Sequence, residues 1–306
     1  MKNNLQREVA DDEIDLRALL TIIMQGKWTI ICITLIFSVA SIIYAVSQPD
    51  IYRADITLVP ANEDTGAGNL PGQLGGLASL AGLNLGNGSD SKTRLALAVL
   101  NSKKFKMDFI ERHDLLPELM AVEEWNASTN RLVFNEDIYN PTTGTWIRKV
   151  DPPKQAKPSL QEASLVFDRI LTSVEDKASG LVSISIEHRS PYIAQQWLEW
   201  LTHDLNENMR AREKEESAKS IEYLETQLEK THLADIKQVL FELIEEQTKT
   251  YMFTEVRDEY IFKTIDPAIV PEQKAKPSRA LICIIGTFIG GFFSIGIVLV
   301  RDIYSK

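Results

Sequence analysis

Residues 28–47 read WTIICITLIFSVASIIYAVS and residues 280–300 read ALICIIGTFIGGFFSIGIVLV, and these two stretches decide the fold. Neither stretch contains a charged residue. Because an α-helix rises by about 1.5 Å per residue, each stretch would reach ~30 Å, the thickness of the hydrocarbon core of a bilayer. The sequence therefore predicts two transmembrane helices that hold residues 48–279 between them, with the tails 1–27 and 301–306 together on the other side of the membrane.

Each stretch also has an alternative interpretation. A cleaved signal peptide is the alternative for residues 28–47, since Ala45-Val46-Ser47 resembles a small-residue cleavage site, but the apolar part of a signal is usually only ~7–15 residues long. A buried core helix is the alternative for residues 280–300. That stretch is, however, apolar around its whole circumference and framed by Arg279 and Arg301, as expected of a lipid-facing span.

The orientation is predicted from the basic residues beside the spans. Arg17 and Lys27 precede the first span and only Arg53 follows it closely, while Arg301 and Lys306 follow the second. This distribution favours both termini in the cytoplasm. Lys274, Lys276 and Arg279, just before the second span, argue for the opposite orientation. Long loops, however, translocate largely regardless of their charge.

Composition limits what the exported part can do. The chain carries a net charge of −10, and its tails hold as many basic as acidic residues, so the negative excess belongs to residues 48–279. Such a surface repels phosphate backbones, which argues against a nucleic-acid ligand. Both cysteines, Cys32 and Cys283, lie in the apolar stretches, so the exported part has no disulfide to rely on. The short tails lead us to expect no kinase or other output domain in the cytoplasm.

No motif for catalysis, a cofactor or a metal is evident. The four histidines are scattered without an H-E-x-x-H pattern, and no serine stands in G-x-S-x-G. Gly66–Gly88 holds eight of the fifteen glycines but has no G-x-G-x-x-G. We therefore expect no enzyme, cofactor or metal, although a glycosidase-like pair of carboxylates stays open. The glycine-rich segment is either an exposed loop or, as its leucines favour, a surface that is buried against a neighbouring protomer or faces a shared cavity.

Alternating residues predict an α+β fold for the exported part. Residues 52–58 and 182–187 alternate apolar and polar side chains, as half-buried strands do. Residues 170–174 lead into the second of these across a hairpin turn at Glu175–Gly180, and residues 259–265 form a fourth β-rich run. Because strands come from near both spans, we expect one membrane-proximal sheet with helices packed on it or projecting away.

Helices are predicted at residues 92–100, 103–110, 234–255 and after a capping box of Ser159 with Glu162. The longest should begin at Ser190-Pro191 and run to about residue 231. Its first half has an apolar stripe that should pack on the sheet. The stripe consists of Ala194, Trp197, Leu198, Leu201, Leu205 and Met209.

Beyond Met209 this helix becomes strongly polar until residue 219. One interpretation is a solvated helix held by ion pairs four residues apart. The other is a helix that leaves its own domain and meets copies of itself, with mixed charges between protomers and an apolar seam at the far end. The residues of this predicted oligomer interface are Arg210, Arg212, Glu213, Glu216, Ile221, Leu224 and Leu228.

Four phrases, in this order between two terminal spans, resemble the chain-length determinant family of bacterial polysaccharide co-polymerases. They are LASLAGLNLG at 77–86, SISIEHRSP at 183–191, IEYLETQL at 221–228 and IDPAIVP at 265–271. The resemblance implies an inner-membrane protein whose periplasmic α+β base and long helix assemble into bell-shaped homo-oligomers. It implies a regulator that sets the modal length of O-antigen or a related surface polysaccharide made by a partner membrane polymerase. Lipid-linked polysaccharide and membrane lipid are further partners to consider, and the short tail places the chain with the kinase-free members.

The resemblance also marks two sets of residues near the second span. Pro267, Pro271 and Pro277 correspond to a proline-rich stalk, and prolines would stiffen it. Gly286, Gly290 and Gly291 correspond to a glycine-rich part of the span, where Gly286-x-x-x-Gly290 would let two helices approach closely. The alternative is that this glycine pair simply faces lipid. Against the regulator stand two alternatives: a two-span extracytoplasmic ligand sensor with separate cytoplasmic partners, and a periplasmic hydrolase that trims glycans.

Overall fold

The computed structural model describes residues 24–61 and 88–305. The predictions for the glycine-rich segment up to residue 87 and for most of the N-terminal tail lie outside these residues. The chain divides into two compact units, and each is described by itself. One consists of residues 1–50 with 275–306, and the other of residues 51–274.

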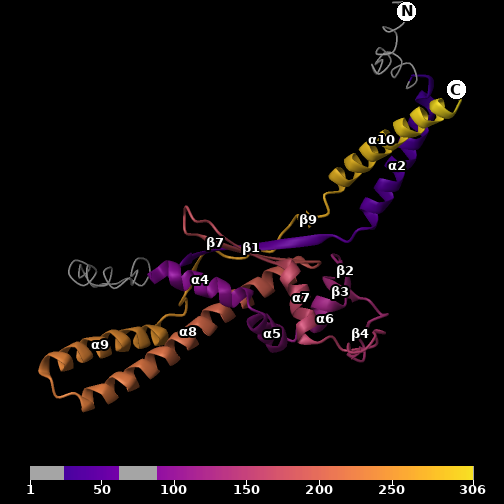
Figure 1. Cartoon of the computed structure of the whole chain (residues 1–306). Helices are drawn as coiled ribbons and strands as arrows, with labels where there is room; N and C mark the ends of the chain where they lie inside the picture. The colour runs from indigo at the N-terminus through magenta and orange to yellow at the C-terminus, as the bar shows by residue number, and fades with distance from the viewer. Residues whose placement is uncertain (1–23, 62–87, 306) are drawn as a thin grey trace, which may run out of the picture. The chain divides into compact units, whose positions relative to one another are not determined.

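The first unit is a pair of apolar helices, α2 (Lys27–Ser47) and α10 (Arg279–Ser305), which lie side by side (Figure 1). Both are long and apolar enough to cross a membrane. Only 6% of the apolar window of the first helix and 17% of that of the second are buried, whereas the core helix of a soluble protein is mostly buried. The exposure therefore speaks against the core-helix alternative. Helix α10 continues past the apolar stretch to Ser305, because no proline or glycine follows Arg301 to end it.

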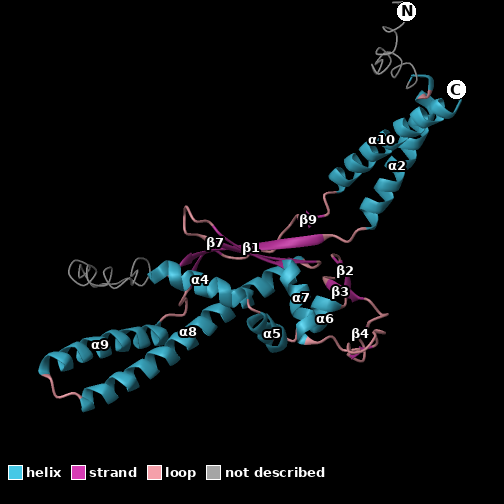
Figure 2. Cartoon of the chain, viewed as in Figure 1, coloured by secondary structure: helices cyan, strands magenta, loops and turns pink. Residues whose placement is uncertain are grey.

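The second unit is built on an antiparallel sheet, of which β1 and β7 are labelled in Figure 2. Its four main strands have the order β6-β7-β1-β8. These strands are β6 (Leu171–Glu175), β7 (Val182–His188), β1 (Ile51–Pro60) and β8 (Phe262–Asp266). Strand β1 pairs with β7 from Tyr52↔His188 to Leu58↔Val182. The expected single sheet that gathers strands from both ends of residues 48–279 is confirmed. A short strand β9 (Lys274–Lys276) follows at the junction of the units.

The hairpin between β6 and β7 follows the turn predicted at residues 175–180. Gly180 has φ +71°, a left-handed conformation that costs glycine no strain. The Asp176 side chain accepts hydrogen bonds from the backbone N–H of Ala178 at 3.0 Å and from the Ser179 hydroxyl at 2.6 Å. These bonds satisfy the turn locally, which is why the sequence alone was sufficient to locate it.

Strand β8 begins at Phe262, three residues later than predicted, because a side chain from the long helix binds the residues before it. Asn206 Oδ1 accepts the backbone N–H groups of Ile261 at 2.9 Å and Phe262 at 3.0 Å. Asn206 Nδ2 donates to the Phe262 carbonyl at 3.2 Å. A tertiary contact, rather than local β-propensity, therefore sets the start of this strand.

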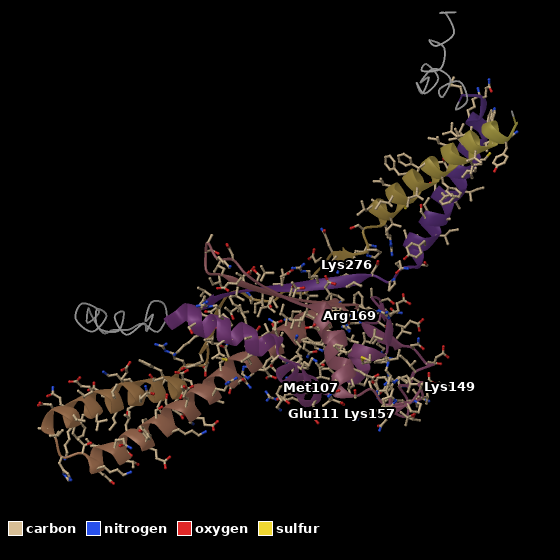
Figure 3. The ribbon with its side chains drawn as sticks, viewed as in Figure 1. Met107, Glu111, Lys149, Lys157, Arg169 and Lys276 are labelled. Atoms are coloured by element: carbon tan, nitrogen blue, oxygen red, sulfur yellow. The ribbon has the colours of Figure 1, made fainter. Side chains whose placement is uncertain are left out.

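Helices cover the sheet and extend from it. They are α4 (Gly88–Asn101), α5 (Lys103–Arg112), α6 (Leu116–Met120), α7 (Leu160–Ile170), α8 (Pro191–Lys230) and α9 (Ala234–Val256). The capping box is confirmed: Glu162 N–H donates to Ser159 Oγ at 3.2 Å and Ser159 N–H to Glu162 Oε2 at 3.1 Å. Met107 and Glu111 of α5 and Arg169 of α7 are labelled in Figure 3.

The core lies between the sheet and the first half of α8. All six residues of the predicted apolar stripe are buried, with Trp197 and Leu201 fully enclosed against inward residues of β1 and β7 such as Leu58 and Ile184. Burying a large apolar side chain stabilises a fold by about 1.5–3 kcal/mol, so this stripe is a major source of stability. The second half of α8 and α9 run antiparallel, joined by Thr231–Leu233 (Figure 1).

Two small hairpins were not predicted. One pairs β2 (Val122–Asn126) with β3 (Arg131–Phe134), and the other pairs β4 (Tyr139–Asn140) with β5 (Thr145–Trp146). Their strands are two to five residues long, too short for a convincing alternation in the sequence. A connection that includes Lys149 and Lys157 leads from them to α7 (Figure 3).

Candidate functional site

Two of the three predicted membrane glycines face the partner helix within the same chain. A Cβ added to Gly290 would lie 2.5 Å from Phe37 Cβ and 3.4 Å from Thr34 Cα. A Cβ added to Gly286 would collide with Ser41 Cβ. Small residues at such positions let helix backbones approach closely inside a membrane. Here the Gly286-x-x-x-Gly290 pair gives α10 its close approach to α2.

This contact extends along both helices. Near the start of α2, a Cβ added to Gly26 would lie 2.5 Å from a methyl group of Val298. At the other end, Arg279 Nη2 donates to Asp50 Oδ1 at 2.9 Å. Sequence reasoning missed both contacts. The signal that could have found them is a glycine and an aspartate just outside the first span, opposite the ends of the second.

Gly291 lies on a different face of α10. Among the described residues, nothing lies within 4 Å of a Cβ added there. Successive helical residues are turned by about 100°, so Gly290 and Gly291 cannot face the same neighbour. A hollow of about 540 Å³ surrounds Gly291, lined almost entirely by apolar atoms. Its other lining residues are Cys283, Ile284, Thr287, Phe288, Phe292 and Ile295.

The three predicted stalk prolines lie on the connection from β8 to α10. Pro267 follows β8 directly and is exposed, and Pro271 is half-buried in a segment without regular structure. Pro277 stands two residues before α10, where its carbonyl accepts the Arg279 backbone N–H at 2.9 Å. A proline lacks an N–H and has a restricted φ, so each limits the conformations of this connection. Their role as a stiff stalk stays a prediction.

The polar part of α8 is divided between solvent and other helices of the same chain. Arg212 and Glu216 are exposed, whereas Glu213 accepts from Lys92 of α4 at 3.3 Å. Lys214 pairs with Glu255 of α9 and lies 5.7 Å from the centre of the Tyr251 ring. Neither interpretation of the sequence included this cover by α4 and α9. Only part of the polar surface is therefore left for another protomer.

Other members of the predicted interface have neighbours within the chain. Arg210 pairs with Glu207 of its own helix at 2.6 Å. Ile221, Leu224 and Leu228 are half-buried. Leu224 lines an open cleft of about 640 Å³ together with Leu243 and Gln247 of α9. The assignment of these residues to an oligomer interface stays a prediction.

Helix α9 exposes several large apolar side chains. Its exposed fractions include 58% for Phe241 and 78% for Val256. Further exposed apolar residues on the same helix are Ile236, Val239, Leu243, Met252 and Phe253. Exposed apolar surface of this extent typically marks a site of protein or membrane contact.

His188, the last residue of β7, and Glu118 of α6 are titratable groups with shifted pKa values. His188 is buried; its Nδ1 accepts the Ser190 backbone N–H at 3.0 Å, and its Nε2 donates to the Glu118 carbonyl at 3.1 Å. Burial lowers the pKa of His188, and nearby Arg189 lowers it further. Burial raises the pKa of the Glu118 carboxyl, while the Trp197 indole offsets part of that rise. The His188 ring thus connects α6 to the residue that caps the start of α8.

The described residues include a small cluster of polar side chains around Asp204. No three His, Cys, Asp or Glu side chains among the described residues are grouped to hold a metal ion. His113 stacks on Trp200 with ring centroids 4.5 Å apart and pairs with buried Asp204, whose carboxylate also binds Arg112 at 3.1 Å. This cluster joins α5 to α8 and is explained by that structural role.

Comparison with known proteins gives two family matches. Residues 12–110 match the family model Wzz, described as "Chain length determinant protein". Residues 261–303 match GNVR, described as "G-rich domain on putative tyrosine kinase", and this match contains all six of the predicted stalk prolines and membrane glycines. The first match contains α2, β1, α4 and most of α5.

Comparisons over the whole chain add less information about the family than these two matches. No curated protein matched the chain. Among solved structures, a "full-length bacterial polysaccharide co-polymerase" matches with 12% sequence identity and a TM-score of 0.36, over 96% of this chain and 98% of that chain. At this TM-score the likeness carries no argument about the fold, which rests on the strands and helices themselves. The two family matches agree with the resemblance to the chain-length determinant family that the sequence phrases indicated.

Proposed function

We propose that this protein regulates the modal chain length of a surface polysaccharide, the O-antigen of lipopolysaccharide or a related polymer, without itself catalysing a reaction. It acts as a homo-oligomer in the bacterial inner membrane, with both termini in the cytoplasm and residues 48–279 in the periplasm. Its partner is the membrane polymerase that makes the polymer. The observation that carries the proposal is the chain length determinant match over residues 12–110. This match contains the first apolar helix, α2, and strand β1 of the sheet.

The membrane contact with the polymerase is assigned to the Gly291 face of α10. Gly286 and Gly290 face α2, whereas no described atom lies within 4 Å of a Cβ added to Gly291. The apolar hollow around Gly291, walled by Phe288 and Phe292, has the size and chemistry to receive side chains of another transmembrane helix. Pro267, Pro271 and Pro277 then limit the freedom of the connection between this helix and the sheet unit.

Self-association is assigned to the hairpin of α8 and α9. Arg212 and Glu216 are exposed charges of opposite sign on the polar stretch. The exposed apolar side chains of α9, such as Phe241 and Val256, lie on the same hairpin. A solvated monomer gains nothing from exposing them, whereas contact between protomers would bury them.

Deletion of the gene tests the central claim. Surface polysaccharide from cells with and without the chain is separated on a gel. We expect the modal band pattern to be lost on deletion and restored by the chain. An unchanged band distribution would rule out the regulator and favour the ligand sensor, and release of sugar from polymer by the purified chain would contradict a non-enzymatic role.

Two glycine substitutions test the assigned membrane contact against each other. Gly290→Leu should break the packing of α2 on α10 and lower the thermal stability of the detergent-solubilised chain. Gly291→Leu should leave that stability unchanged and shift the polysaccharide band pattern, because it fills only the open hollow. A normal band pattern with Gly291→Leu would reject this face as the polymerase contact.

Mass measurement of the detergent-solubilised chain with both spans intact tests self-association. We expect a homo-oligomer, and a charge reversal such as Glu216→Lys should reduce its size. A monomer at all concentrations would remove the basis of the proposed mechanism.

A further inference from the structure

Three aromatic side chains from distant parts of the sequence meet at the surface of the second unit. They are Tyr52 of β1, Trp125 of β2 and Tyr192 in the first turn of α8. The ring centroids of Tyr52 and Trp125 lie 5.5 Å apart with the planes at 82°, and those of Trp125 and Tyr192 lie 6.1 Å apart at 54°. None of the three belongs to the hydrophobic core, and Tyr192 is 48% exposed. We call these three residues the aromatic surface.

The Trp125 ring, which lies between the other two, is held in place by a hydrogen bond within its own hairpin. Trp125 Nε1 donates to Asn130 Oδ1 at 2.9 Å across the β2–β3 turn. The turn itself is held by Asn126, whose Oδ1 accepts the backbone N–H of Ser128 at 3.0 Å and of Thr129 at 3.2 Å. A ring held in this way loses little conformational freedom on binding, so its contact with a ligand is not offset by the cost of ordering it.

The neighbouring hairpin shows the same pattern. Phe134 and Tyr139 have ring centroids 5.5 Å apart, and Tyr139 and Trp146 have theirs 4.9 Å apart. All three are only half-buried. Large aromatic side chains usually enter the core when a fold can bury them. The segment 122–146 instead keeps four of them at or near the surface.

Polar groups around the aromatic surface narrow the class of ligand. Trp125 is flanked in the sequence by exposed Glu124 and Asn126, and the turn ends in exposed Asn130 and Arg131. Amide, carboxylate and guanidinium groups form planar, multiple hydrogen bonds. A sugar ring needs this combination, since its C–H face packs on an aromatic ring while its hydroxyls bond to polar planar groups. An aliphatic protein or lipid partner would instead favour an apolar rim.

We propose that the aromatic surface of Tyr52, Trp125 and Tyr192 is a binding site for the repeat units of a glycan polymer. That this polymer is the surface polysaccharide rests on the proposed function. The site lets the protein contact the growing chain itself in addition to the enzyme that extends it. Tyr192 and Trp125 supply the stacking faces, and Asn130 holds the central ring in position.

Binding is tested with the full chain in detergent micelles. The probe is surface polysaccharide from the producing cells, freed from its lipid anchor by mild acid and fractionated to short oligomers, and dextran oligomers of equal size serve as comparison. Saturation-transfer NMR and calorimetric titration report the contact. We expect Tyr192→Ala and Trp125→Ala to weaken binding by about five- to tenfold each, the effect of losing one aromatic contact.

Matched variants separate binding from folding. Tyr223→Ala makes the same chemical change at a residue 64% exposed on the distal half of α8 and should bind as the parent does. Trp125→Phe keeps an aromatic ring and should bind within about threefold of the parent. If Trp125→Ala unfolds, Tyr192→Ala carries the test, because its side chain is half in solvent.

The outcomes distinguish this inference from the proposed function. No binding by a full chain that still restores the modal band pattern would overturn the inference and leave the proposed function standing. Unweakened binding by folded Tyr192→Ala and Trp125→Ala would also overturn it. Site-dependent binding by a chain that fails to restore the band pattern would support the inference and count against the proposed function.

Discussion

The two halves of α8 differ in their surroundings, although one unbroken helix runs through both. In the first half, Trp197, Leu201 and Leu205 are fully buried between the sheet and neighbouring helices. In the second half, Arg212 and Glu216 are exposed and Tyr223 is 64% exposed. Most of the stability of a helix comes from packing an apolar face. The comparison shows that one half of α8 belongs to the core, while the other half is covered only in part, by α4 and α9.

The largest expected difference between the halves is in core packing. Leu201→Ala should lower the free energy of unfolding by about 2–5 kcal/mol, because it leaves a cavity in a fully buried site. Leu228→Ala, the same change at a half-buried site on the distal half, should cost much less. Denaturant unfolding of the detergent-solubilised chain measures both. Equal losses would mean that the distal half is packed as tightly as the proximal half.

The next difference concerns side-chain hydrogen bonds. Asn206→Ala should cost about 1–3 kcal/mol, because it leaves the buried N–H groups of Ile261 and Phe262 without their acceptor. Thr226→Ala on the distal half should change little, since its hydroxyl bonds only to the Glu222 carbonyl one turn back. Hydrogen exchange at Ile261 and Phe262 measures the effect. Unchanged protection of these two amides in Asn206→Ala would contradict it.

A smaller effect depends on pH. Because burial lowers the pKa of His188, the unfolded chain binds a proton more readily than the folded one below the ordinary histidine value of 6.5. The stability contributed by neutral His188 is complete above that pH and is lost as the pH falls through the folded pKa. The raised pKa of Glu118 acts in the opposite direction, since its proton favours the folded state at low pH.

Variants of His188 and Glu118 separate the contributions of these two side chains to the pH dependence of stability. His188→Gln should flatten the fall in unfolding free energy between pH 6.5 and more acidic values, and Glu118→Gln should steepen it, as measured by denaturant titrations at each pH. His203→Gln, on the exposed side of α8, is the matched control and should leave the slope unchanged. An identical slope in the parent and His188→Gln would reject the assignment.

The smallest effect is expected from a surface ion pair on the distal half. Lys219 and Glu215 lie 2.5 Å apart with both side chains largely exposed. Solvent and salt screen such pairs, so Lys219→Ala should barely change the thermal midpoint of unfolding. Lys214→Ala should have a larger effect, because Lys214 joins α8 to Glu255 and Tyr251 of α9. Indistinguishable midpoints for the two variants would show that Lys214 adds no stability to the hairpin.

The aromatic surface and the start of β8 are two features that the sequence alone could not predict. Tyr52, Trp125 and Tyr192 are more than sixty residues apart from one another in the chain, and no local pattern connects them. Asn206 lies in a helix whose periodicity indicates which residues are apolar but not which backbone groups a buried amide will bind. Both features depend on contacts between elements, which the order of residues does not specify.

The sequence by itself determined the two apolar helices, the capping box at Ser159, the turn at Gly180 and the buried stripe of α8, because local propensity and periodicity fix each of them. It also carried the phrases that resemble the chain-length determinant family. Only the tertiary structure decided that Gly286 and Gly290 face α2 while Gly291 stays open, and that α4 and α9 cover part of the polar stretch of α8. The physical reason is that a side chain's neighbours depend on how the helices pack, which local sequence rules do not reach.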